Sequence, residues 1–288
     1  MKKKLLVLLT LIISLGAILA GCGSSQSSDS GDATEGTDKQ EEVTLKVGLN
    51  GSGVPIWEFV KEKAAKEGIN LELVEFSDYV RPNVALADGD IDLNAFQTVS
   101  YFDSFIKERD LDLAPISTTL IAPMGIYSEK IEDISDFPEN GSIALPQEAT
   151  NMGRALGLLE QAGLITLTDE FNGNGDLSLI EENPKNIKFT PIVAAQTPRV
   201  LPDVTASIIN NGVAVEAGFT PVEDAIFIED NTATPYINII AVRADETDKE
   251  VFKRLVEIYQ TDEVAQHIKD VFDNSLIPIF VPLEDIGW

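Results

Sequence analysis

The chain has 288 residues, 44% of them hydrophobic, and carries 48 acidic against 21 basic side chains, for a formal net charge of −27. A surface this acidic repels nucleic acid and anionic lipid head groups, so we expect neither as a partner. One histidine and one cysteine leave almost no room for a zinc site or for a Cys–His or Ser–His catalytic pair, and a single cysteine forms no internal disulfide. We expect no metal, no cofactor and no enzymatic activity.

Residues 1–21 have the pattern of a signal peptide. Three lysines at positions 2–4 precede an apolar stretch over residues 5–20. As a helix this stretch spans roughly 24 Å at ~1.5 Å per residue, which is short of the roughly 20 residues that a membrane-spanning helix needs. We therefore predict removal of the segment. The mature net charge is then −30, because the segment holds three lysines and no acidic residue.

Cys22 follows Leu19, Ala20 and Gly21 directly. This stretch resembles the lipobox of bacterial lipoproteins, and the resemblance implies diacylation of the Cys22 sulfur and cleavage before it. Two acyl chains explain stable anchoring, since a single chain holds a protein to a bilayer only marginally. Residues 23–42 contain no large apolar side chain, so we predict a lipidated flexible tether over 22–42. The alternative is a secreted protein with a stray thiol.

From Val43 onward the sequence alternates predicted strands and helices. Strands are predicted at residues 43–49, 71–76, 91–95, 143–145, 206–209 and 238–242. Helices are predicted from the Gly51–Gly53 turn to near Gly68, at 81–89, at 99–109, at 151–162, in a short segment ending at Gly218, and from about Lys249 onward. Repeated βαβ units predict an α/β protein with mainly parallel sheets.

Two features suggest chemistry at first sight. Asp88, Asp90 and Asp92 resemble a calcium loop, but Leu93 and Val99 stand where such a loop needs glycine and glutamate. We therefore predict a helix-to-strand turn there. The lone histidine, His267, lies in a polar helical stretch, and we interpret it as a solvated surface residue.

The segment 146–151 leads from a predicted strand into a predicted helix, with Arg154 placed in the first helical turn. Exposed N–H groups and the helix dipole at such a position favour an anion. The planar guanidinium of Arg154 adds a bidentate donor suited to a carboxylate. A plain surface arginine is an equally good interpretation of this pattern alone.

Several motifs, spaced in order along the mature chain, are similar to those of the methionine-binding lipoproteins of the MetQ/NlpA family. They lie at residues 74–80, 85–92, 94–97, 150–155, 209–210, 235–238 and 287–288. The resemblance implies a two-lobed periplasmic-binding-protein-like fold of type II, with the ligand cleft between two α/β lobes. Lobe 1 would be residues 43–121 plus 236–288, and lobe 2 residues 122–235. A chain that crosses twice between lobes makes a hinge that can close on a ligand.

The resemblance also implies roles for particular side chains. Arg154 would take the ligand carboxylate, with Asn151 nearby, while Asn210 and Asn238 would hold the polar head of an amino acid. Because Arg154 would lie in a cleft wall, we expect the change Arg154→Ala to weaken binding with little effect on ligand-free stability.

The remaining predicted site residues concern the ligand's side chain. Tyr79, Phe96 and Tyr101 would wall it, and aromatic faces suit a thioether. Core packing is the alternative for Phe96, and a plain loop position the alternative for Tyr79. Members of the family often carry histidine where this chain has Thr98, so we expect a wider, more tolerant pocket here.

The favoured function is a lipid-anchored protein, facing outside the cytoplasm, that delivers L-methionine to the permease of an ABC importer. Another small apolar amino acid or a methionine-containing dipeptide is the alternative ligand. An enzyme on the same fold and a surface adhesin are the remaining hypotheses. A ligand-induced thermal shift separates the binding protein from the adhesin, and turnover of the ligand would indicate the enzyme.

Overall fold

The structure is a computed structural model that describes residues 42–230 and 234–288. The predicted signal peptide, Cys22 and all but the last residue of the predicted tether lie outside the described residues. Within the described ranges, no helix is both long and apolar enough to cross a membrane.

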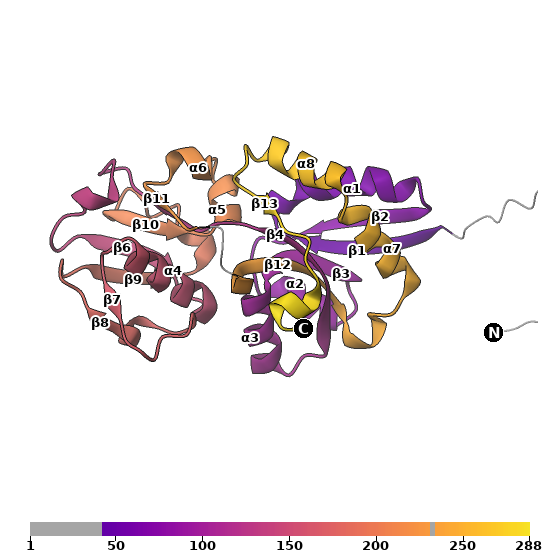
Figure 1. The fold of residues 1–288 in the computed structure, drawn as a ribbon, viewed down its shortest axis with the longest axis horizontal. Coiled ribbons are helices and arrows are strands. Elements are labelled where there is room, and N and C mark those ends of the chain that lie inside the picture. Colours follow the sequence, from indigo (N-terminus) through magenta and orange to yellow (C-terminus); the bar gives the residue numbers. More distant parts are fainter. Residues whose placement is uncertain (1–41, 231–233) are drawn as a thin grey trace, which may run out of the picture. The chain divides into compact units, whose positions relative to one another are not determined.

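One sheet draws its strands from the two ends of the described sequence, in the order β13-β4-β12-β3-β1-β2 (Figure 1). Its strands are β1 (Val43–Leu49), β2 (Ile69–Glu75), β3 (Leu93–Thr98), β4 (Leu113–Ile121), β12 (Ile237–Arg243) and β13 (Ile277–Pro278). The helices of this first lobe are α1 (Val54–Ala65), α2 (Arg81–Ala87), α3 (Val99–Arg109), α7 (Glu250–Tyr259) and α8 (Asp262–Val271). A short 3-10 helix, η1 (Gly51–Gly53), leads into α1.

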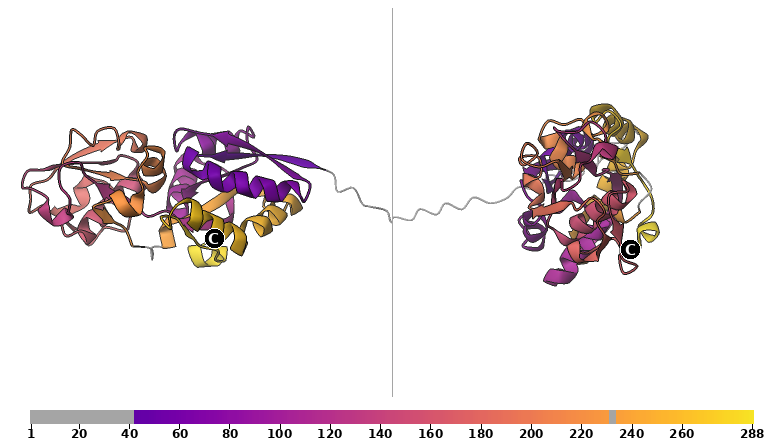
Figure 2. Two further views of the ribbon diagram at one scale, coloured as in Figure 1. Left: turned by 90° about the horizontal axis from the view of Figure 1, so that it is seen from above. Right: turned by 90° about the vertical axis from the view of Figure 1, so that its left-hand side faces the viewer.

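The second lobe is built on a sheet from the middle of the chain, in the order β11-β5-β10-β6-β9. Its strands are β5 (Gly125–Tyr127), β6 (Ser142–Pro146), β9 (Lys188–Ile192), β10 (Ala206–Ile209) and β11 (Phe227–Ile228), and a separate pair is formed by β7 (Thr166–Leu167) and β8 (Ile180–Glu182). Its helices are α4 (Ala149–Gln161), α5 (Asn211–Glu216) and α6 (Pro221–Asp224). Figure 2 shows the two groups of elements from above and from the side.

The chain passes between the sheets in two segments that connect β4 to β5 and β11 to β12. The second of these segments includes the 3-10 helix η5 (Thr234–Tyr236). The predicted lobe boundaries, 121/122 and 235/236, lie in these two connections, and as boundaries they stay a prediction.

Both sheets are mixed, so the expectation of mainly parallel sheets is wrong. β1 runs parallel to β2 and β3, and β6 runs parallel to β9 and β10. However, β12 is antiparallel to both β3 and β4, and β5 is antiparallel to β10 and β11. The reason lies in the connectivity: β4 carries the chain out of the first sheet and β12 brings it back beside it, so these neighbours run in opposite directions.

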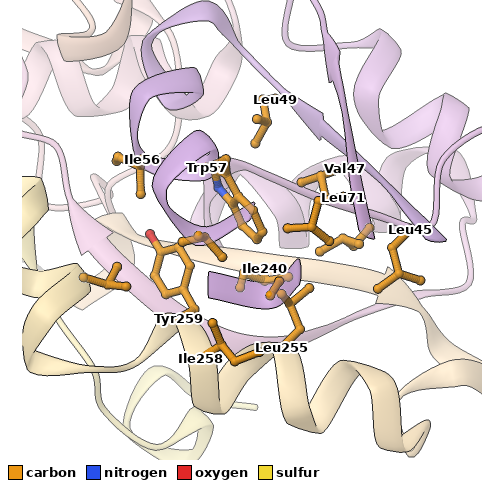
Figure 3. Close-up of a cluster of buried hydrophobic side chains, with 14 of the residues drawn as sticks. Leu45, Val47, Leu49, Ile56, Trp57, Leu71, Ile240, Leu255, Ile258 and Tyr259 are labelled. Atoms are coloured by element: carbon orange, nitrogen blue, oxygen red, sulfur yellow. The ribbon is translucent and has the colours of Figure 1, made fainter. Parts of the chain in front are cut away.

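The core of the first lobe packs α1, α7 and α8 against its sheet. Helix α1 begins with Pro55 in its first turn, where no donor is lost, and it buries Ile56, Trp57, Val60 and Ala64. Figure 3 shows Trp57 facing Tyr259 from α7, and their ring centroids lie 5.3 Å apart.

Most predicted elements are confirmed, although several bounds differ and several strands, most of them short, were not predicted. Helix α4 begins at Ala149 rather than 151, which places Arg154 in the second turn instead of the first. Strand β3 continues to Thr98, and the terminal helical region is two helices, α7 and α8. The nine-residue strand β4 was not predicted, because residues Ser117–Thr119 look polar in the sequence although they are buried.

The two features that suggested chemistry have local structural roles. The carboxylate of Asp92 accepts from Lys46 N at 2.7 Å, and the described residues contain no acidic or histidine cluster suited to a metal ion. His267 is more covered than predicted: its ring stacks on Phe59 with centroids 4.0 Å apart, and Nε2 lies 3.2 Å from Pro55 O.

Candidate functional site

A pocket lies between elements of the two lobes and holds about 820 Å³ of empty space, counted to its open mouth. All eight side chains predicted as ligand contacts are among those that line it: Tyr79, Phe96, Thr98, Tyr101, Asn151, Arg154, Asn210 and Asn238. The fold thus brings together residues from five separate parts of the chain, while their role in binding stays a prediction.

Three of these residues form an aromatic wall on the first lobe. Phe96 comes from β3 and Tyr101 from α3, and their rings meet edge to face with centroids 6.4 Å apart. Tyr79 lies 6.0 Å from Phe96 and 6.3 Å from Tyr101, measured between ring centroids. The Tyr101 hydroxyl donates to Tyr79 O at 2.8 Å and so fixes the loop that carries Tyr79.

Burial raises the pKa of both tyrosine hydroxyls well above the usual range. Both groups therefore remain neutral hydroxyls at any physiological pH, and the wall offers an apolar surface with weakly polar tips.

Thr98 joins this wall to the start of α3. Its Oγ1 accepts from Tyr101 N at 3.2 Å, which makes it the N-cap of the helix. The residue therefore has a structural role in addition to lining the pocket.

The polar side of the pocket begins where α4 and β10 meet. Asn210 follows the last residue of β10, and its Nδ2 donates to Asn151 Oδ1 in the first turn of α4 at 3.2 Å. The Asn210 Oδ1 atom is buried and has no hydrogen-bond partner among the described residues. A buried acceptor is stabilised by a donor, so this oxygen is available to an N–H group.

Asn211 presents a second acceptor of the same kind. Its Nδ2 is 3.3 Å from both Pro123 O and Ser275 O, while its Oδ1 is buried and finds no partner in the part of the chain that the structure describes. Asn210 and Asn211 both line the same pocket, and each has one buried side-chain oxygen without a partner among the described residues.

Arg154 is deeply buried and already paired, which the sequence did not indicate. Its Nε lies 2.9 and 3.1 Å from the two carboxylate oxygens of Glu229, and its Nη2 donates to Glu229 Oε2 at 2.5 Å. The same Nη2 donates to Ala122 O at 2.9 Å. Nη1 has no partner among the described residues, so it is the guanidinium nitrogen left to meet a ligand.

The Arg154–Glu229 pair is tied to both connections between the lobes. Ala122 and Met124 belong to the first, and Met124 N donates to Glu229 Oε2 at 3.2 Å. Tyr236 belongs to the second, and the guanidinium of Arg154 lies 4.3 Å from its ring centroid.

Sequence reasoning missed several residues at the site, among them Asn50, Trp57, Asn211, Tyr259 and Glu229. Asn50 had a usable signal, because it directly follows a parallel strand, where open α/β sheets place their ligands. Trp57 and Tyr259 look like plain core residues in the sequence. Glu229 lies 75 positions from Arg154, and no local pattern connects the two.

The lining suits a small molecule that carries both an anionic group and N–H donors. Among the described residues that line the pocket, Arg154 is the one that is charged at neutral pH. Its free nitrogen can donate to an anionic oxygen, the two unpaired asparagine oxygens can accept N–H groups, and the aromatic wall can cover an apolar chain.

Comparison with known proteins identifies the family of the chain. The sequence model of the NlpA lipoprotein family matches residues 45–280. The D-methionine-binding lipoprotein MetQ of Salmonella typhi is 39% identical over 264 residues, covering 90% of this chain and 92% of that protein. An uncharacterised lipoprotein, YhcJ, of Bacillus subtilis is 36% identical over 247 residues, covering 86% of this chain and 88% of its own length.

Solved structures give the same result. A nutrient-binding protein from Burkholderia cenocepacia, bound to methionine, matches with a TM-score of 0.79 and 41% identity, covering 82% of this chain and 100% of that one. The methionine-binding protein MetQ matches with a TM-score of 0.79 and 37% identity, over 83% of this chain and 99% of that one.

Proposed function

The chain belongs to the NlpA lipoprotein family, and from this premise we propose that it binds methionine and delivers it to the permease of an ABC importer. The observation that carries the proposal is the convergence of all eight predicted side chains on one pocket, beside two buried asparagine oxygens without donors. The family is one of binding proteins, and we assign the chain no reaction.

We propose a specific orientation for the ligand. Arg154 Nη1 and Asn151 receive the carboxylate, and Asn210 with Asn238 receives the ammonium group. The thioether chain lies against Tyr79, Phe96 and Tyr101, since polarisable sulfur packs well on aromatic rings. A charged ligand side chain would be buried without a partner, which is costly.

A thermal-shift panel tests the ligand. It contains the twenty L-amino acids, D-methionine, methionine sulfoxide and the dipeptide Gly-Met, because the curated relatives are named for the D-isomer. We expect stabilisation by methionine and none by lysine, arginine, aspartate or glutamate. A thermal shift with a charged amino acid and none with methionine would contradict the assignment of methionine as the ligand. No thermal shift with any compound of the panel would contradict amino-acid binding altogether.

We propose that Thr98 makes the pocket tolerant of a longer or oxidised methionine derivative. A smaller response to methionine sulfoxide and Gly-Met in Thr98→His than in wild type supports this. The control is Thr98→Ser, which keeps the helix-capping oxygen; equal responses in all three proteins contradict the idea.

We further propose that the protein is held by lipid at Cys22 on the outer side of the cytoplasmic membrane. This position suits a protein that captures its ligand outside the cell and passes it to a membrane-embedded permease.

A further inference from the structure

The charge of Arg154 is balanced before any ligand enters the pocket. Glu229 does not line the pocket, yet its carboxylate accepts from Nε and Nη2 of Arg154, and each of the two side chains is only 4% exposed. Among the described residues that line the pocket, Arg154 is therefore the one charged group, and its counter-charge is the carboxylate of Glu229, which lies outside the lining.

This balance determines which net charge a ligand can bring. In a poorly polar interior, a lone cation strongly attracts an anion, because Coulomb interactions are little screened there. A balanced pair exerts no such net attraction, and a ligand with an unbalanced charge would be buried without compensation.

The hydrogen bonds of Glu229 also orient the guanidinium. They occupy Nε and Nη2, and Ala122 O shares Nη2. Nη1 remains without a partner among the described residues, and the ring of Tyr236 lies against the guanidinium. One donor nitrogen is thus left for an anionic group.

The asparagine acceptors on the polar side of the pocket complete the requirement. Asn210 and Asn211 line the pocket, and the Oδ1 atom of each is buried without a partner among the described residues, so an ammonium group beside them would find two acceptors. A ligand with an ammonium and a carboxylate meets both demands and has no net charge.

We propose that Glu229 is a positioning and specificity-determining residue: by neutralising and orienting Arg154 it makes the pocket select zwitterions over anions. The identity of the zwitterion rests on the proposed function. The selection rule itself concerns the net charge of any ligand in this pocket.

Calorimetry with two ligands of the same side chain tests this. L-methionine is a zwitterion, and 4-(methylthio)butanoate is the same molecule without the ammonium group, hence an anion. For wild type we expect much tighter binding of methionine. For Glu229→Gln we expect the preference for methionine over the anion to fall by about tenfold or more, since the buried cation is then unbalanced.

Three further variants separate charge from packing. Glu229→Asp keeps the charge, and we expect it to retain the wild-type preference even if it is less stable. Glu246→Gln removes a carboxylate that pairs with Arg243 in the first lobe, and it should leave the preference unchanged. Arg154→Gln combined with Glu229→Gln removes both charges, so the preference should stay within about threefold of wild type.

Each outcome decides the proposal. If Glu229→Gln weakens both ligands by the same factor, Glu229 is merely structural and the proposal is overturned. If Glu229→Gln does not fold, the double variant decides: a preference for the anion there would overturn the proposal.

If wild type binds no methionine but another amino acid, the proposed function fails, and the same variants are measured with that amino acid and its analogue without the amino group. If no amino acid binds, both proposals fail.

Discussion

At the scale of single residues, Arg154 behaves differently from the sequence-based expectation. That expectation treated it as a cleft-wall side chain whose removal leaves ligand-free stability unchanged. In the structure it is 4% exposed and forms a bidentate pair with Glu229. Truncating Arg154 therefore leaves the buried carboxylate of Glu229 without its charged partner.

We therefore predict that Arg154→Ala lowers the free energy of unfolding without ligand by about 3–5 kcal/mol, the usual cost of breaking a buried ion pair. Urea denaturation with circular dichroism measures it. The double change Arg154→Ala with Glu229→Ala should recover part of the loss, because no unpaired charge then remains. A single variant as stable as wild type would mean that the pair contributes nothing to the fold.

At the scale of elements, the two lobes meet where η1 faces α5. A Cβ atom on Gly212, in α5, would lie 2.6 Å from Ser52 Oγ and 2.8 Å from Asn50 Nδ2, both in or beside η1. The Ser52 N–H also donates to the carboxylate of Glu216, the last residue of α5, at 3.1 Å. The contact therefore depends on a glycine at one end of α5 and a carboxylate at the other.

We predict that Gly212→Val weakens ligand affinity by about tenfold, because overpacking this contact costs about 1–3 kcal/mol and keeps the lobes apart. Calorimetry measures the affinity. Gly157→Ala in α4 is the control, since its added Cβ finds Phe171 at an ordinary 3.6 Å and should not change binding. Unchanged affinity of Gly212→Val would show that this contact is not needed for binding.

Glu216 makes the same contact sensitive to pH. Glu216 is exposed as a residue, but partial enclosure of its carboxylate raises its pKa above the ordinary 4.5, the N–H of Ser52 opposes the rise, and nearby Glu75 adds to it. A pKa raised by folding means that the native state binds the proton more tightly. The stabilisation from this protonation is complete below pH 4.5 and is lost as the pH rises through the raised pKa.

We predict that Glu216→Gln, which keeps an accepting oxygen, is more stable relative to wild type at neutral pH than at acidic pH. The difference should be about 1 kcal/mol at most, because solvent screens a partly exposed charge. Thermal unfolding of both proteins across this range measures it. A stability difference that does not depend on pH, or that changes with pH in the opposite direction, would show that folding does not raise the pKa of Glu216.

At the scale of the whole molecule, the described residues provide no helix that could cross a membrane, and residues 1–22 lie outside them. We predict that Cys22→Ala leaves binding unchanged but releases the protein from membranes, because two acyl chains provide the anchoring. Fractionation after a high-salt wash measures this, with thermal shift by the ligand as the control for folding. A variant that still sediments with membranes would rule out the lipid anchor at Cys22.

Local spacing in the sequence was enough to predict much of the fold. The strand Val43–Leu49 and the helix Val99–Arg109 are where the pattern placed them, because side-chain periodicity and turn residues act over a few positions. Eight of the residues that line the pocket were predicted through the family resemblance, and Asn50, which directly follows a strand, could have been added to them.

The tertiary structure decided what the local pattern could not. β4 was missed because its hydroxyls are buried yet satisfied by distant groups, such as Val281 O for Thr118. The first sheet is mixed because β4 carries the chain out of it and β12 brings the chain back beside β4, in the opposite direction. The sequence by itself determined most of the longer elements and eight of the residues that line the pocket; only the fold decided that Arg154 is neutralised by Glu229. The physical reason is that burial and charge pairing depend on neighbours in space, and these two residues are 75 positions apart in the chain.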